Sequence, residues 1–162
     1  MKKEPAVSNT SALLFLSKLD NIVFLKNIFS KILIPTAVFD EISSKKDIFY
    51  DNVNYLIDEK FIEVIDIKNT LLARHLSHNL HSGESEAIVL AIEYNYRVIL
   101  DDGKAREIAL SSGLKIIGTL GILKLLKIRG HINETDDELF SRLKKIKFRI
   151  HKDQYFDIMR SP

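Results

Sequence analysis

Acidic side chains stand where short apolar runs of the sequence meet helical patterns. Glu84 opens an apolar run with helical spacing, and Asp101 and Asp102 directly follow the short apolar run at 98–100. Glu41 lies near the end of a helical pattern that follows another such run. Carboxylate oxygens are the ligands that hard divalent cations such as Mg²⁺ and Mn²⁺ prefer. These acids are therefore candidates for a metal site.

The stretch 83–106, GESEAIVLAIEYNYRVILDDGKAR, predicts how two of these acids meet. It reads as a buried helix of about three turns followed by a buried parallel strand. In open parallel sheets, ligands bind beyond the carboxyl ends of the strands. A helix packed antiparallel to the strand returns its N-terminus to that edge. We therefore expect Glu84 and Asp102 to lie close together.

Each acid also has a purely structural interpretation. Glu84 suits the first turn of a helix, where it complements the helix dipole, and Asp102 suits the N-cap of the next helix. Glu86 lies about 200° around the helix from Glu84, so a regular helix cannot aim both at one ion. We therefore expect Glu86 to be solvated or to support the ligands rather than to bind metal.

Short apolar runs alternate with helical patterns along the whole chain. Strands are expected near 6–8, 32–34, 62–65, 98–100 and 115–117, with helices between them. Repeated strand–helix units with short connections indicate an α/β fold. We predict a three-layer sandwich with a mostly parallel central sheet of about five strands flanked by helices.

Composition limits the possible classes of protein. The 162 residues contain no cysteine, which excludes disulfides, thiolate metal sites and a cysteine nucleophile. The apolar runs are too short to cross a bilayer, and the N-terminus lacks the apolar core of a signal peptide, so we expect a cytoplasmic protein without membrane association. No glycine-rich phosphate loop follows any strand, which argues against a small-molecule enzyme on a doubly wound sheet.

Two further groups of residues have alternative interpretations. The segment 142–152 contains six Lys or Arg and no acid. It is either a charged sheet edge that resists pairing with other chains, or a surface that contacts a phosphate backbone. His75, His78 and His81 lie three residues apart. They form either a transition-metal site without a specified third ligand or a polar surface beside Glu84.

Four segments in order resemble the PIN-like domains. They are VSNTSALLFLSKL, ILIPTAVFDEI, HSGESEAIVLAIEYNYRVILDDGKAREIA and GLKIIGTLGILKLLKIRGHI. The resemblance is to the DUF3368 branch, with its VapC-like toxin ribonucleases. It implies a PIN-like domain over 1–132 and a helical or extended extension over 133–162 packed on the same domain.

The resemblance also implies an activity. PIN-like domains are metal-dependent endoribonucleases that use Mg²⁺ or Mn²⁺ to hydrolyse RNA, often as the toxin of a toxin–antitoxin pair. An RNA substrate, a small antitoxin protein and a homodimer are therefore the expected partners.

Carried over residue by residue, the resemblance assigns the site. The catalytic candidates are Glu41, Glu84 and Asp102, and the metal-ligand candidates are Asn9, Glu84, Asp101 and Asp102. Residues expected to contact substrate or to support the ligands are Thr10, Ser11, Glu86, Arg106 and Thr119. Thr10, Ser11 and Thr119 are also plausible N-caps, and Arg106 pairs either with an acid or with an RNA phosphate.

Asn9 departs from the commoner PIN-like pattern, which has aspartate at this position. An amide oxygen can ligate a hard cation but adds no charge, so metal affinity should fall. The alternative function is therefore a catalytically weakened PIN-like module that binds RNA or another protein. In either case we expect Asn9, Glu84 and Asp102 to line one pocket.

Overall fold

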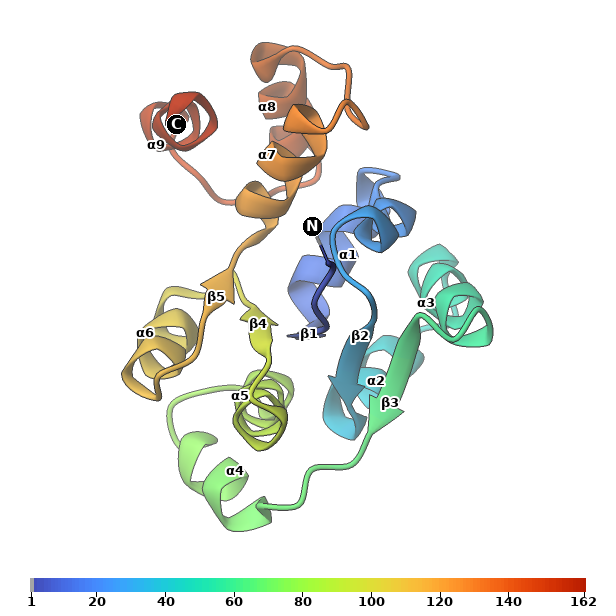
Figure 1. Ribbon diagram of the computed structural model, residues 1–162, viewed down its shortest axis with the longest axis vertical. Coiled ribbons are helices and arrows are strands. Elements are labelled where there is room, and N and C mark those ends of the chain that lie inside the picture. The colour runs from blue at the N-terminus through green and yellow to red at the C-terminus, as the bar shows by residue number, and fades with distance from the viewer. Residues whose placement is uncertain (1) are drawn as a thin grey trace.

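The computed structural model describes residues 2–162 and contains a five-stranded, all-parallel sheet in the order β3-β2-β1-β4-β5 (Figure 1). The strands are β1 (Ala6–Ser8), β2 (Ile32–Pro35), β3 (Ile62–Ile65), β4 (Arg97–Ile99) and β5 (Ile116–Ile117). Helices cover both faces of this sheet. The predicted three-layer α/β fold is confirmed.

Alternate residues along the strands point into two separate hydrophobic cores, as the pleat of a strand requires. In β1, Ala6 belongs to the first core and Val7 to the second. Val7 is paired with Leu33 and Val98, and both of these side chains lie in the second core. Both faces of the sheet are therefore buried at its centre, which explains why β2 reads as a continuous apolar run.

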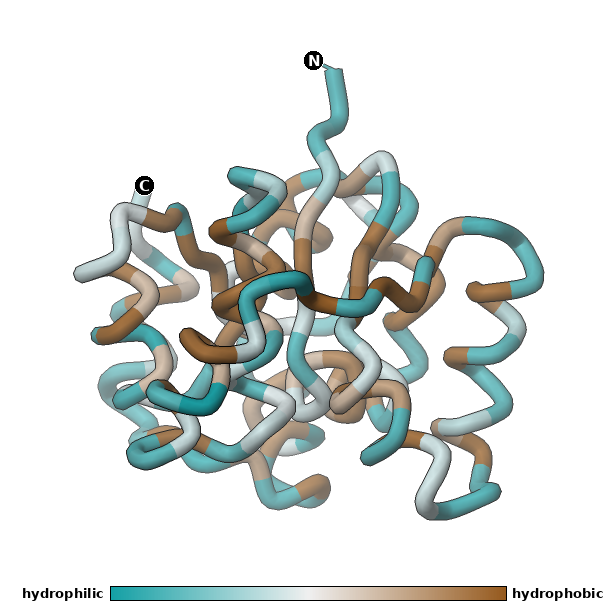
Figure 2. Tube along the Cα trace, turned by 90° about the horizontal axis from the view of Figure 1, so that it is seen from below, coloured by the Kyte–Doolittle hydropathy of each residue, from teal (hydrophilic) through white to brown (hydrophobic). Residues whose placement is uncertain are grey.

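Helices and one 3₁₀ segment fill the outer layers. They are α1 (Thr10–Lys18), η1 (Ile22–Asn27), α2 (Thr36–Ser43), α3 (Ile48–Asp58), α4 (Thr70–Leu76), α5 (Ser82–Tyr94), α6 (Gly103–Ser111), α7 (Thr119–Ile128), α8 (Asp136–Lys145) and α9 (Lys152–Arg160). The first core takes side chains from α1, η1, α2, α3, α7, α8 and α9, and the second from α5 and α6. Outer helices alternate hydrophobic and hydrophilic stretches along the trace (Figure 2), as expected when one helix face is buried.

Helix α5 is the most deeply buried helix near the candidate acids. The five consecutive residues from Ala87 to Ala91 are all buried, because α5 packs against β1, β2 and β4 as well as α2, α4 and α6. The helix ends at Asn95, which adopts the left-handed conformation with φ of 54°. Because α5 packs against these strands, its N-terminus, with Glu84 in the first turn, is fixed at the carboxyl edge of the sheet.

The C-terminal segment packs on the first core. Leu139 and Leu143 of α8 and Tyr155 of α9 are fully buried there, and the Tyr155 hydroxyl donates a hydrogen bond to the Asp136 carbonyl oxygen at 2.9 Å. Residues 145–150 show the expected alternation, with Phe148 buried between exposed neighbours. However, residues 146–150 form a loop between α8 and α9, and β3 and β5 are the edges of the sheet. The interpretation of this segment as a charged sheet edge is therefore wrong.

Within residues 2–162, no helix combines the length and the apolar character needed to cross a membrane.

Candidate active site

Two adjoining cavities lie at the carboxyl edge of the sheet, and Glu84 lines both. The first, of about 420 Å³, is lined by Asn9, Thr10, Ser11, Leu14, Glu41, His81, Ser82 and Glu84. The second is a groove of about 800 Å³ that shares Ser11, His81 and Glu84 with the first. It continues past Asp101, Asp102 and Arg106 to residues 147–150. The fold therefore brings the predicted acids from α2, α5 and the segment after β4 to one edge of the sheet, but Asn9 and Asp102 line different cavities rather than one pocket.

Glu41 reaches this region from the second half of α2. Its carboxylate accepts a hydrogen bond from the Thr10 hydroxyl and lies directly against the backbone of Gly83. A Cβ atom at position 83 would overlap the carboxylate, with Glu41 Cδ only 3.0 Å away. Glycine at position 83 therefore allows Glu41 to approach the first turn of α5, beside Glu84.

Glu84 is half-buried at the junction of the two cavities. Its Oε2 accepts a hydrogen bond from the backbone N–H of His81 at 3.3 Å, which closes the start of α5. Burial raises the pKa of Glu84 above its ordinary value, and the negative charges of Asp102 and Glu41 raise it further, while the His81 hydrogen bond opposes the shift. Among residues 2–162, no Lys, Arg or His forms an ion pair with these three carboxylates. No cationic side chain in this part of the chain therefore stands within ion-pair distance of these three carboxylates.

Asp101 and Asp102 are neighbours in sequence, but their contacts differ. Asp102 is exposed and caps α6, with its Oδ1 accepting from the backbone N–H of Ala105 at 2.9 Å. The two oxygens of Asp101 instead accept hydrogen bonds from Thr119, from its backbone N–H at 2.8 Å and from its hydroxyl at 2.5 Å. Burial raises the pKa of Asp101, and the Thr119 hydrogen bonds and the charge of Arg106 oppose this shift. These contacts make Asp101 an anchor for the start of α7, and its metal-ligand role stays a prediction.

Asn9 follows β1 and lies in the first cavity, where it is only 2% exposed. Its Oδ1 accepts a hydrogen bond from the backbone N–H of Ala12 at 3.3 Å, and its Nδ2 donates to the Ser11 hydroxyl at 3.3 Å. The amide therefore caps α1 while it faces the same cavity as Glu41 and Glu84.

The remaining predicted residues divide between the site and its support. Glu86 turns away from Glu84, and its Oε2 accepts from the backbone N–H of Ala37 at 2.9 Å. This bond fixes the start of α2, the helix that carries Glu41. Arg106 lines the groove and donates from Nη1 to the Leu100 carbonyl oxygen at 2.9 Å. Thr10, Ser11 and Arg106 thus border the cavities, whereas Glu86 and Thr119 support the elements around them.

The structure adds residues to the groove that the sequence did not single out individually. Lys147, Arg149 and Gln154 line it beside the acids. The six Lys and Arg residues of 142–152 indicated a basic surface, and part of that segment forms this wall of the groove. The sequence could not show which of its cations face the groove, because that depends on where α8 ends.

The chemistry of the donor set suits a hard divalent cation. Within residues 2–162, no three His, Asp or Glu side chains stand close enough together to form a ready-made ion site. Mg²⁺, however, usually retains several water ligands and is bound through one or two carboxylates. Glu84 and Asp102 provide such carboxylates, and Glu41, Asn9 and Thr10 provide further oxygens nearby.

A comparison with protein families identifies the family of this chain. Residues 5–161 match the DUF3368 family, which is described as a PIN domain. Among solved structures, a PilT N-terminus domain protein, SSO1118 from the hyperthermophilic archaeon Sulfolobus solfataricus P2, is 17% identical in sequence with a TM-score of 0.37. That alignment covers 91% of this chain and 98% of the archaeal one. No curated protein matches the sequence. Because the family match extends over nearly the whole chain, this protein belongs to the DUF3368 family of PIN domains.

Proposed function

We propose that this protein is a metal-dependent endoribonuclease that hydrolyses phosphodiester bonds of RNA with Mg²⁺ or Mn²⁺. PIN domains are generally metal-dependent nucleases. The observation that carries the proposal is the approach of Glu41, Glu84 and Asp102 from three different elements without a cationic partner. Placing carboxylates together in this way costs stability, and a bound cation would offset that cost.

The residues of the site have distinct roles in this proposal. Glu84 and Asp102 would hold the ion, with Glu41 and Asn9 completing its surroundings. A bound ion supplies positive charge at the scissile phosphate and lowers the pKa of a water molecule. Thr10 orients Glu41 through its hydroxyl.

Backbone groups at the same edge also favour an anionic substrate. Helices α1, α5 and α6 all begin beside the cavities, at Thr10, Ser82 and Gly103. The N-terminus of a helix carries partial positive charge, so these three helix starts attract a phosphate group.

The biological setting is a finer part of the same proposal. We propose a cytoplasmic toxin that a small antitoxin protein inhibits and that acts as a homodimer. The motif resemblance supports this setting. Expression of the protein alone should then arrest growth, and co-expression of a short protein encoded beside it should restore growth.

A second candidate function follows from Asn9. Its amide oxygen is already engaged by the backbone N–H of Ala12, and it adds no charge to the cavity. These features favour a module that still binds RNA or a protein partner but cleaves weakly.

Cleavage assays with matched variants test the proposal. Single-stranded RNA is incubated with the protein in Mn²⁺, in Mg²⁺ and in EDTA. Asp102→Asn keeps an N-cap of equal quality for α6 and removes only the charge, and Glu84→Gln keeps an oxygen that can accept from His81. We expect metal-dependent cleavage that falls by at least about 100-fold in each variant, in line with losing a major electrostatic contributor. Cleavage that persists in EDTA or in both variants contradicts the proposal.

A further inference from the structure

The loop between α8 and α9 borders the groove that contains Glu84 and Asp102. Lys147, Phe148, Arg149 and Ile150 of this loop all line the groove. A basic segment and an acidic cluster, about 45 to 65 residues apart in sequence, thus face the same space.

The loop is held in place by contacts on both sides. The backbone N–H of Phe148 donates to the Leu143 carbonyl oxygen at 3.0 Å. The Phe148 ring packs edge-on against Phe15, with ring centroids 4.9 Å apart. Lys144 Nζ donates to the Ile150 carbonyl oxygen and closes the loop. The two exposed side chains between these anchors, Lys147 and Arg149, are therefore presented from a fixed backbone.

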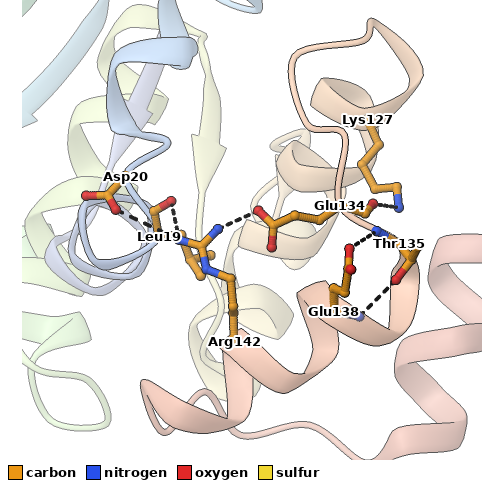
Figure 3. Close-up of polar contacts among 7 residues, drawn as sticks. All are labelled: Leu19, Asp20, Lys127, Glu134, Thr135, Glu138 and Arg142. Carbon is orange, nitrogen blue, oxygen red and sulfur yellow. Dashed lines mark hydrogen bonds and ion pairs between the residues drawn. The ribbon is translucent and has the colours of Figure 1, made fainter.

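The structure separates the cations of this basic segment by role. Arg142 is engaged by Glu134 and by the Leu19 carbonyl oxygen, at 2.5 and 2.9 Å, and binds α8 to the end of α1 (Figure 3). Lys147 and Arg149, in contrast, form no ion pair and no side-chain hydrogen bond with other residues of 2–162. Their charges remain available although acids line the same groove.

The backbone of Lys147 adopts a conformation that is unusual for lysine. Its φ of 63° lies in the left-handed region, where glycine is preferred at the end of a helix. Lys60, with φ of 59°, occupies the same position just after α3. There too the backbone N–H of the next residue, Phe61, donates to a leucine carbonyl oxygen, that of Leu56. Lys60 is not among the groove-lining residues. The chain therefore contains a matched control for the strained lysine at the groove.

We propose that Lys147 and Arg149 bind the phosphates of a single RNA strand, next to the phosphate that a cation bound by Glu84 and Asp102 would hold. The proposal depends on the proposed function for the identity of the substrate. Apolar side chains beside the cations, among them Phe15, Ile117 and Ile150, provide a surface for bases. Cations beside apolar side chains, as on this wall of the groove, are typical of single-strand binding, and the groove volume of about 800 Å³ suits a few nucleotides rather than a duplex.

Binding of RNA without cleavage tests the proposal. A labelled single-stranded RNA oligonucleotide is titrated by fluorescence anisotropy in EDTA at several salt concentrations. We expect Lys147→Gln and Arg149→Gln each to weaken binding by about fivefold and to reduce the salt slope by about 0.7, as for one lost phosphate contact on a single strand. Lys147→Arg should retain the parent affinity.

Glycine variants distinguish the effect of the Lys147 charge on RNA binding from an effect on stability. Lys147→Gly should raise the melting temperature by about 1–3 °C, because the left-handed strain is relieved, and should still weaken RNA binding. Lys60→Gly should raise the melting temperature similarly and leave RNA binding unchanged.

The outcomes distinguish this inference from the nuclease proposal. If the Lys147 and Arg149 variants bind RNA as the parent does, or if Lys60→Gly weakens binding equally, the inference is overturned even when cleavage is observed. The inference is also overturned if duplex RNA binds as tightly as the single strand. Binding that depends on Lys147 and Arg149 without cleavage in any metal supports the inference and contradicts the nuclease proposal.

Discussion

Replacement of Asn9 by aspartate changes the charge of the first cavity with almost no change of shape. Aspartate is as good an N-cap as asparagine, so α1 should still begin at the same residue. The Ser11 hydroxyl, which accepts from Nδ2 of Asn9, has to turn and donate to the new carboxylate, and that carboxylate adds a buried negative charge beside Glu41 and Glu84. The variant should therefore fold as the parent does but with lower stability in the absence of metal.

The size of the effect follows from the added charge. Each unit by which the cavity raises the pKa of the new carboxyl costs about 1.4 kcal/mol at neutral pH. A cost of about 2 kcal/mol lowers the melting temperature of a protein of this size by about 4–8 °C. In saturating Mn²⁺ the new carboxylate becomes a ligand, and a tenfold gain in metal affinity restores about 1.4 kcal/mol.

Thermal melts of the parent and of Asn9→Asp, in EDTA and in Mn²⁺, measure both effects. We expect a lower melting temperature for the variant in EDTA and a larger rise on addition of Mn²⁺. Asp102→Asn in the same background should abolish the larger rise while the α6 cap is preserved. An equal Mn²⁺ response in parent and variant would show that residue 9 does not face a bound ion.

Three further variants test individual parts of the site. Folding raises the pKa of Glu84, so the folded protein favours the protonated carboxyl. The contribution of this carboxyl to stability is complete below the ordinary glutamate pKa of about 4.3, and it is lost as the pH rises through the pKa that Glu84 has in the folded protein. Glu84→Gln should therefore be more stable than the metal-free parent at pH 7, and melts between pH 4 and 8 should show the difference vanishing at the acidic end. Gly83→Ala places a Cβ where the Glu41 carboxylate lies; because that flexible side chain can move away, melts should show an unchanged or higher metal-free stability and a smaller Mn²⁺ response. Asp101→Ala removes both hydrogen bonds from Thr119 and should cost about 2 kcal/mol in urea unfolding, whereas a cost below about 0.5 kcal/mol would show that Asp101 does not anchor α7.

Much of the fold was predictable because the local patterns and the topology agree. The strands predicted at 62–65 and 98–100 coincide with β3 and overlap β4, and the proximity of Glu84 to Asp102 follows from one helix packed antiparallel to one strand. The different roles of Asp101 and Asp102 were not predictable. Which of two neighbouring acids turns inward depends on where α7 begins, and Thr119 at that start binds Asp101.

The segment 145–150 shows a second limit of sequence patterns. Alternating charged and apolar residues are typical of a half-buried strand. The same alternation arises here because α8 ends at Lys145 and is followed by the left-handed Lys147, which turns Phe148 into the core and leaves Arg149 exposed. The position of Glu41 was likewise set by a tertiary contact, its approach to Gly83, which no local pattern encodes.

The most direct test of the metal site is a crystal structure of the protein grown with Mn²⁺, in which anomalous scattering locates the ion. We predict an anomalous peak between the carboxylates of Glu84 and Asp102, with Glu41 or Asn9 bound directly or through water. The peak should disappear in crystals of Asp102→Asn grown in the same way. A fully occupied Mn²⁺ site elsewhere, with no peak at this edge of the sheet, would contradict the assignment of these carboxylates as the metal centre.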